Sequence, residues 1–173
     1  MDANKLTYRM VTPLLLLIVL LFGVINIATA EQWLYVNPVR PNETISIETS
    51  PNSFGINDVQ QSAKFCSKTS KFICVTTKGF QFSVPRNISD ETVEWESDGV
   101  KYKSKKLNRF NILGMQETIF HIHRKEGEGV AVFLYSKKKG LIGLGGFQSD
   151  SMGFYILAQS CGFGADKDCV MVK

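Results

Sequence analysis

The clearest alternation of apolar and polar positions lies between residues 92 and 105. Asp98-Gly99, at the centre of this stretch, is a favoured two-residue hairpin turn, because both positions require a positive φ. Folding the chain there places aromatic residues on one face and opposite charges on the other: Trp95 opposite Tyr102, Val93 opposite Ser104, Glu96 opposite Lys101, and Glu94 opposite Lys103. The pattern therefore predicts a β-hairpin with one buried face and one face in water.

A three-stranded meander is predicted from Thr118 to Phe147, with strands at 119–123, 130–135 and 141–147. With tight turns between the strands, apolar side chains line up on one face in two rows: Phe120, Tyr135 and Ile142, then Ile122, Phe133 and Leu144. The other face carries two more rows: His121, Leu134 and Gly143, then His123, Val132 and Gly145. Both faces are apolar enough to indicate a central sheet.

Shorter segments of strand composition lie at residues 33–36, 44–47, 72–76, 81–85, 154–159 and 169–172. Only the stretch from Asp58 to Phe65 has helical composition, and a short helix is expected there with Asn57 or Asp58 as its N-cap. The predicted fold class is mainly β. We expect a single antiparallel β domain of about seven to nine strands, arranged as a sandwich or a partly open barrel.

The first thirty residues have the features of a secretory signal peptide. Cations outweigh the one acid at the start, an apolar run extends from Val11 to Ile27, and Ala28 and Ala30 stand where signal peptidase reads small side chains. Cleavage after Ala30 would leave one domain at residues 31–173, in the periplasm or outside the cell. The alternative is an uncleaved membrane anchor in residues 11–30, since a spanning helix needs about 20 apolar residues.

The four cysteines form two pairs with the same spacing, Cys66 with Cys74 and Cys161 with Cys169. An even number of cysteines in an exported chain indicates disulfides. Of the three possible connectivities we favour these nearest-neighbour pairs, which would staple the two ends of the domain. A zinc site is the alternative, but cysteine ligands of zinc usually stand about two to four residues apart, closer than in this chain.

The net charge of the chain is +4, and removal of residues 1–30 takes away two cations and one acid, which leaves +3. This mildly basic balance does not predict a nucleic-acid partner. Five cations nevertheless cluster in one stretch, where they would give weak, salt-sensitive contact with an anionic membrane or glycan surface: Lys101, Lys103, Lys105, Lys106 and Arg109. The alternative is that they solvate and protect the outer face of the hairpin.

His121 and His123 are the only histidines, and on a strand they point to the same side, where they could share a metal ion. No third ligand has a position defined by the sequence, so we expect no metal site and no cofactor, with this pair as the candidate if a metal binds. A catalytic Ser or Cys needs a base and an orienting group, and no Gly-x-Ser-x-Gly motif occurs. The glycines at 140–146 do not precede a helical pattern, which argues against a phosphate loop.

These patterns predict an exported, non-enzymatic protein with a binding or structural role in the cell envelope or outside the cell. Its partner would be a protein or an envelope ligand. The alternative is a metal-dependent or hydrolytic enzyme that uses His121 and His123. Asn42 and Asn87 stand in glycosylation acceptor sequences, which matter only in a host that secretes through an endoplasmic reticulum.

Overall fold

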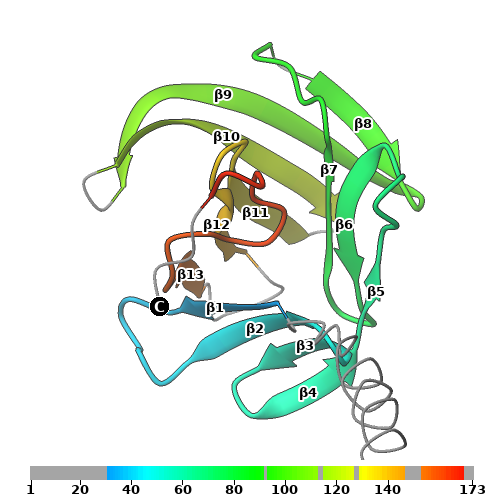
Figure 1. Ribbon diagram of the computed structural model, residues 1–173, viewed down its shortest axis with the longest axis vertical. Helices are drawn as coiled ribbons and strands as arrows, with labels where there is room; N and C mark the ends of the chain where they lie inside the picture. Colours follow the sequence, from blue (N-terminus) through cyan, green and yellow to red (C-terminus); the bar gives the residue numbers. More distant parts are fainter. Residues whose placement is uncertain (1–30, 92, 113–114, 127–128, 147–152, 170–173) are drawn as a thin grey trace, which may run out of the picture.

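The computed structural model describes residues 31–91, 93–112, 115–126, 129–146 and 153–169 (Figure 1). These residues form thirteen β-strands and no α-helix, so the prediction of a mainly β fold is confirmed. The predicted signal peptide, residues 1–30, lies outside the described residues. In the described ranges there is no helix with the length and apolar character to cross a membrane.

The strands form two antiparallel sheets. The larger sheet has ten strands in the order β4-β3-β2-β1-β13-β12-β11-β10-β9-β8. Their bounds are β1 (Gln32–Val36), β2 (Thr44–Thr49), β3 (Asn52–Ile56), β4 (Val59–Ser62), β8 (Val93–Ser97), β9 (Val100–Ile112), β10 (Met115–Glu126), β11 (Gly129–Ser136), β12 (Gly140–Gly145) and β13 (Phe154–Leu157). The smaller sheet contains β5 (Lys64–Phe65), β6 (Phe72–Thr76) and β7 (Gln81–Pro85).

The larger sheet curves strongly around the core. In Figure 1, β9 and β10 arch over the upper end, β1 to β4 lie at the lower end, and the three-stranded sheet stands at the right between them. The edge strands β4 and β8 each pair on one side only, so the sheet does not close into a barrel. One continuous cluster of buried side chains includes residues of both sheets, and the described residues therefore share a single core.

The hairpin of β8 and β9 has the predicted register, with Trp95 opposite Tyr102 and Glu94 opposite Lys103. At its turn, φ is 50° at Asp98 and 75° at Gly99, as the two-residue turn requires. The Lys103 ammonium lies 2.7 Å from the Glu94 carboxylate on the outer face. The alternation of side chains and the turn together determined this register.

The meander is also confirmed, with one correction to its register. Phe120 lies opposite Tyr135 and Ile122 opposite Phe133, as predicted. Tyr135, however, pairs with Leu141 instead of Ile142, because a bulge shifts the register between Leu134 and Tyr135. An extra residue in one strand changes its partners beyond that point, and no turn motif indicated it.

The prediction of a helix from Asp58 to Phe65 is wrong, because this stretch forms β4 and β5. Asn57 is a turn residue with φ of 52°, instead of an N-cap. Gly55 of β3 lies opposite Gln60 of β4, and the Gln60 amide donates across it to Ser46 Oγ at 3.1 Å. Strand pairing, of β4 with β3 and of β5 with β6, thus overrides a weak helical preference. The expected number of seven to nine strands is too low, since the sequence did not indicate β3, β4 or β5.

The end of the described chain lies against the turn between β11 and β12. Leu141 N–H donates to the Phe163 carbonyl at 2.9 Å, and Gly162 N–H donates to the Lys139 carbonyl at 2.7 Å. The predicted strand at 169–172 begins at Cys169, which is not in a strand, and its other residues lie outside the described ranges. Residues 158–169, which we call the C-terminal loop, are therefore held by backbone hydrogen bonds to a neighbouring turn.

Replacement of Gly162 by alanine tests how closely this loop approaches β12. A Cβ at position 162 would overlap the Leu141 carbonyl oxygen, so Gly162→Ala should lower the free energy of unfolding by about 1–3 kcal/mol. Gly79→Ala is the matched control, because a Cβ there meets nothing within 4 Å. Denaturant unfolding measures both variants, and an equal loss of stability in the two would contradict the close approach.

Candidate functional site

The four cysteines are all paired, as Cys66–Cys74 and Cys161–Cys169. The favoured connectivity is confirmed, and the zinc alternative is wrong because no thiolate is left to bind an ion. Cys66–Cys74 links the end of β5 to β6, where Cys66 N–H also donates to the Cys74 carbonyl at 3.2 Å. Cys161–Cys169 closes the C-terminal loop on itself. In each disulfide the two cysteines are separated by eight positions in the sequence.

Both disulfides line one cleft of about 370 Å³, which we call the disulfide cleft. The hairpin of β5 and β6 forms one wall, and the C-terminal loop forms the other. The closed disulfide loops are thus brought together in space although they are almost a hundred residues apart in the chain. The sequence predicted the disulfides but gave no sign that they face a common cleft.

The floor of the disulfide cleft is apolar. Trp33 of β1 and Phe163 of the C-terminal loop are both 6% exposed and meet edge to face with ring centroids 5.2 Å apart. Phe65 lies 5.7 Å from Phe163, and Phe65 and Ile73 are both half-buried against the core. The half-buried side chains leave apolar surface that a ligand could cover.

The wall formed by the C-terminal loop is anchored by Tyr35 and Tyr135. The fully buried Tyr35 hydroxyl donates to the Leu141 carbonyl at 3.0 Å and accepts from Phe163 N–H at 3.2 Å. Burial raises the pKa of Tyr35 far above its ordinary value. Tyr135 donates to the Gly164 carbonyl at 3.1 Å, and burial raises the pKa of Tyr135 to about 12. Both hydroxyls therefore stay protonated at neutral pH. Tyr35 holds the loop by accepting from Phe163 N–H, and Tyr135 holds it by donating to the Gly164 carbonyl.

The rim of the disulfide cleft carries charges of both signs, in three cations and two acids: Lys68, Arg86, Lys167, Glu31 and Asp166. All five are exposed. The Arg86 guanidinium donates from Nε to the Ser70 carbonyl at 2.8 Å, which fixes its position beside the β5–β6 hairpin. An apolar floor under a rim with one excess cation suits a ligand with an apolar body and an anionic group.

His121 and His123 do lie together on the outer face of β10. Nε2 of His123 is 3.0 Å from Nδ1 of His121, and the ring centroids are 4.2 Å apart. The pKa of His121 is lowered by burial and by the neighbouring charges of His123 and Lys105. Among the described residues, no group of three or more His, Cys, Asp or Glu gathers around an ion position.

The five clustered cations do not form one surface. Lys101, Lys103 and Lys105 are exposed on the outer face of β9, where Lys103 is paired with Glu94. Lys106 lies opposite Phe120 and pairs with Asp90 at 2.7 Å. The side chain of Arg109 falls outside the described part of the chain. Three of the five predicted residues thus share a face, and one of those three is neutralised by an acid.

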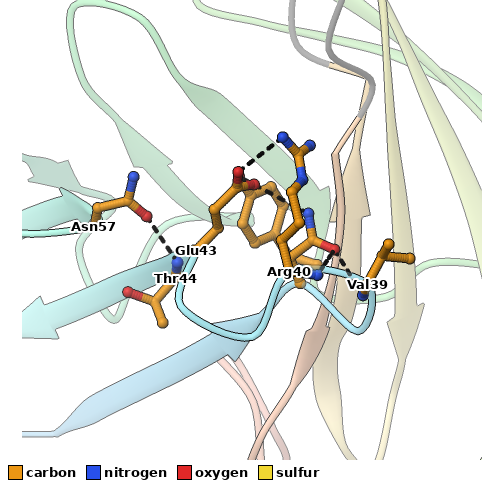
Figure 2. Close-up of polar contacts among 7 residues, drawn as sticks. Val39, Arg40, Glu43, Thr44 and Asn57 are labelled. Atoms are coloured by element: carbon orange, nitrogen blue, oxygen red, sulfur yellow. Dashed lines mark hydrogen bonds and ion pairs between the residues drawn. The ribbon is translucent and has the colours of Figure 1, made fainter.

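A polar cluster that the sequence did not predict lies in the loop between β1 and β2 (Figure 2). The Glu43 carboxylate pairs with Arg40 at 2.8 Å and accepts from the Asn37 amide at 3.1 Å. Asn37 in turn accepts from the backbone N–H groups of Val39 and Arg40. These contacts fix a loop that leaves Val39 84% exposed and also leaves Asn42, which stands in an acceptor sequence, exposed.

Comparisons with protein-family models, with curated proteins and with solved structures find no match to this chain. The class of protein is therefore defined by its own fold and site: a disulfide-bonded protein of two antiparallel sheets with one apolar cleft between its disulfide loops.

Removal of the Tyr35 hydroxyl tests the anchoring of the cleft wall. Tyr35→Phe leaves the Phe163 N–H and the Leu141 carbonyl without a partner in the core, so the free energy of unfolding should fall by about 1–3 kcal/mol. Tyr155→Phe is the matched control, because its hydroxyl is half-buried and 3.5 Å from Glu43, and a change of about 0.5 kcal/mol or less is expected. Thermal or denaturant unfolding would contradict the account if the two variants lost equal stability.

Proposed function

We propose that this chain is an exported, non-enzymatic binding protein that takes an amphiphilic anion into the disulfide cleft. The observation that carries the proposal is the cleft itself, an apolar site of about 370 Å³ between two disulfide-bonded walls. Small-molecule sites are commonly apolar clefts of about 300–1,000 Å³ with a few polar groups at the rim. Disulfides persist in oxidising compartments, which supports the periplasm or the extracellular space.

The proposal includes cleavage after Ala30. This cleavage would add a positive charge near the disulfide cleft, which supports an anionic ligand. The new amino terminus would be Glu31, which lines the disulfide cleft. Glu31 N–H donates to Thr49 Oγ1 at 3.2 Å, and the terminal ammonium would be held at that hydroxyl. One more cation would join the three on the rim, so an anionic head group would lie in a positive potential above the apolar floor.

Binding is favoured over metal-dependent hydrolysis by what surrounds the histidine pair. Among the described side chains, no carboxylate or thiol joins His121 and His123, and their nearest charged neighbour on the adjoining strand is Lys105. A hydrolytic site needs a group that orients the base or completes the metal site. The disulfide cleft, in contrast, has its floor, walls and rim in place.

A titration with 8-anilinonaphthalene-1-sulfonate tests the disulfide cleft, because this probe has an aromatic body and one sulfonate. We expect saturable binding of one probe per chain, seen as an increase in probe fluorescence. Ile73→Asp places a charge on the cleft wall and should weaken binding more than about 10-fold, since an anion would meet an unpaired carboxylate beside the apolar floor.

Val59→Asp is the control for that titration. Val59 is also apolar, is 73% exposed on the edge strand β4, and does not line the disulfide cleft. Its affinity for the probe should equal that of the unchanged protein, and thermal unfolding checks that both variants are folded. Absence of saturable binding, or the same loss in both variants, would contradict the proposed site.

We also propose that the outer face of β9 makes weak contact with anionic surfaces, through Lys101, Lys103 and Lys105. Vesicles of phosphatidylglycerol should bind the protein at about 10 mM salt and release it at about 150 mM, where the Debye length is about 8 Å. The double variant Lys101→Gln/Lys105→Gln should reduce binding at low salt. Lys106→Gln, which changes the other face of β9, should leave binding unchanged. Equal effects of the two variants would show that the outer face of β9 is not the contact.

A further inference from the structure

The hydrogen bond between His121 and His123 holds a nitrogen of each ring beside a nitrogen of the other on one face of β10. Nε2 of His123 and Nδ1 of His121 are 3.0 Å apart, with the two ring planes inclined at 78°. Two nitrogen ligands bound to one ion at about 2.0 Å and at right angles to each other lie about 2.8 Å apart. The separation of 3.0 Å in this structure is close to that of two adjacent ligands on a tetragonal metal ion.

The strand holds this geometry in place. Consecutive odd positions of β10 project to the same face, and β10 is paired on both sides, with β9 and with β11. Because the strand places both side chains on one face, the second imidazole lies next to an ion bound by the first. Binding of the second ligand is then intramolecular, which raises the overall affinity.

Two lysines and two apolar residues lie opposite the pair on the adjoining strands. Lys105 lies opposite His121 and Lys103 opposite His123 on β9, while Leu134 and Val132 are their partners on β11. Lys103 is paired with Glu94, and His123 is exposed. Partial burial and the neighbouring charges of His123 and Lys105 lower the pKa of His121, and neutral imidazole is the form that binds metals.

We propose that His121 and His123 form a two-nitrogen chelate site for a copper(II) ion on the outer face of β10. Copper(II) is preferred because it forms the strongest complexes among the divalent first-row metals and favours tetragonal nitrogen coordination. The ion binds both nitrogens from a point off the line that joins them and replaces their hydrogen bond, and the proton of the donor nitrogen moves to the other nitrogen of the same ring. The remaining coordination positions face solvent.

Titration of the full, oxidised chain with copper(II) alone tests this site. Calorimetry measures the affinity and the number of ions bound, and electron paramagnetic resonance identifies the ligand atoms. We expect one ion per chain at the pair, with hyperfine coupling to two nitrogens. His121→Gln and His123→Gln should each weaken binding more than about 10-fold, since either change removes the chelate. Zinc(II) should bind more weakly than copper(II), and binding should weaken below about pH 6 as the imidazoles are protonated.

These two residues are the only histidines in the chain, so the double variant His121→Gln/His123→Gln removes every imidazole. Copper binding of unchanged affinity in either single variant, or retained in the double variant, would place the ion elsewhere and overturn the proposal. A resonance spectrum of the unchanged protein with coupling to one nitrogen would do the same without any substitution. Far-ultraviolet circular dichroism establishes that the variants keep their strands.

Discussion

The structure depends on the packing of Phe82 and Phe163, which join its separate parts. A sheet with one apolar face needs a second layer to cover it, and the three-stranded sheet supplies that layer through Phe82 of β7, whose side chain is fully buried. The Phe82 ring meets Phe133 of the larger sheet at 5.1 Å and Phe163 at 6.3 Å. Phe163 in turn meets Trp33 of β1. One aromatic cluster therefore connects both sheets and the C-terminal loop.

The disulfide cleft follows from the same packing. Phe163 fixes the base of the C-terminal loop, and Phe65, which meets Phe163 at 5.7 Å, fixes the base of the opposite wall. Beyond these bases each wall is short. In each wall a local disulfide limits the conformational freedom of the chain. The pairing of Cys66 with Cys74 and of Cys161 with Cys169 thus closes both walls of the cleft, and such preorganisation would lower the cost of the binding proposed above.

Local patterns predicted local structure, and contacts between distant segments were not predictable. The turn at Asp98-Gly99 and the alternation around it determined the β8–β9 register, and equal cysteine spacing indicated the disulfides. The stretch from Asp58 to Phe65 was wrongly expected to be a helix, because its own residues do not reveal that β4 pairs with β3 and β5 with β6. The disulfide cleft was missed for the same reason, since its floor combines Trp33, Phe65 and Phe163 from three separate segments. The histidines were expected to share a face, but the 3.0 Å separation of their nitrogens depends on side-chain conformation.

A peptide map of the native protein, prepared from its own host with free thiols blocked at lysis, tests the central claim most directly. The account predicts two bridged peptides, one joining Cys66 to Cys74 and the other joining Cys161 to Cys169, with no blocked thiol and an amino terminus at Glu31. Blocked thiols on these cysteines, or a bridge between Cys66 and Cys161, would contradict it. The two walls of the cleft would then lack their local disulfides, and the chain would not have matured in an oxidising compartment as proposed.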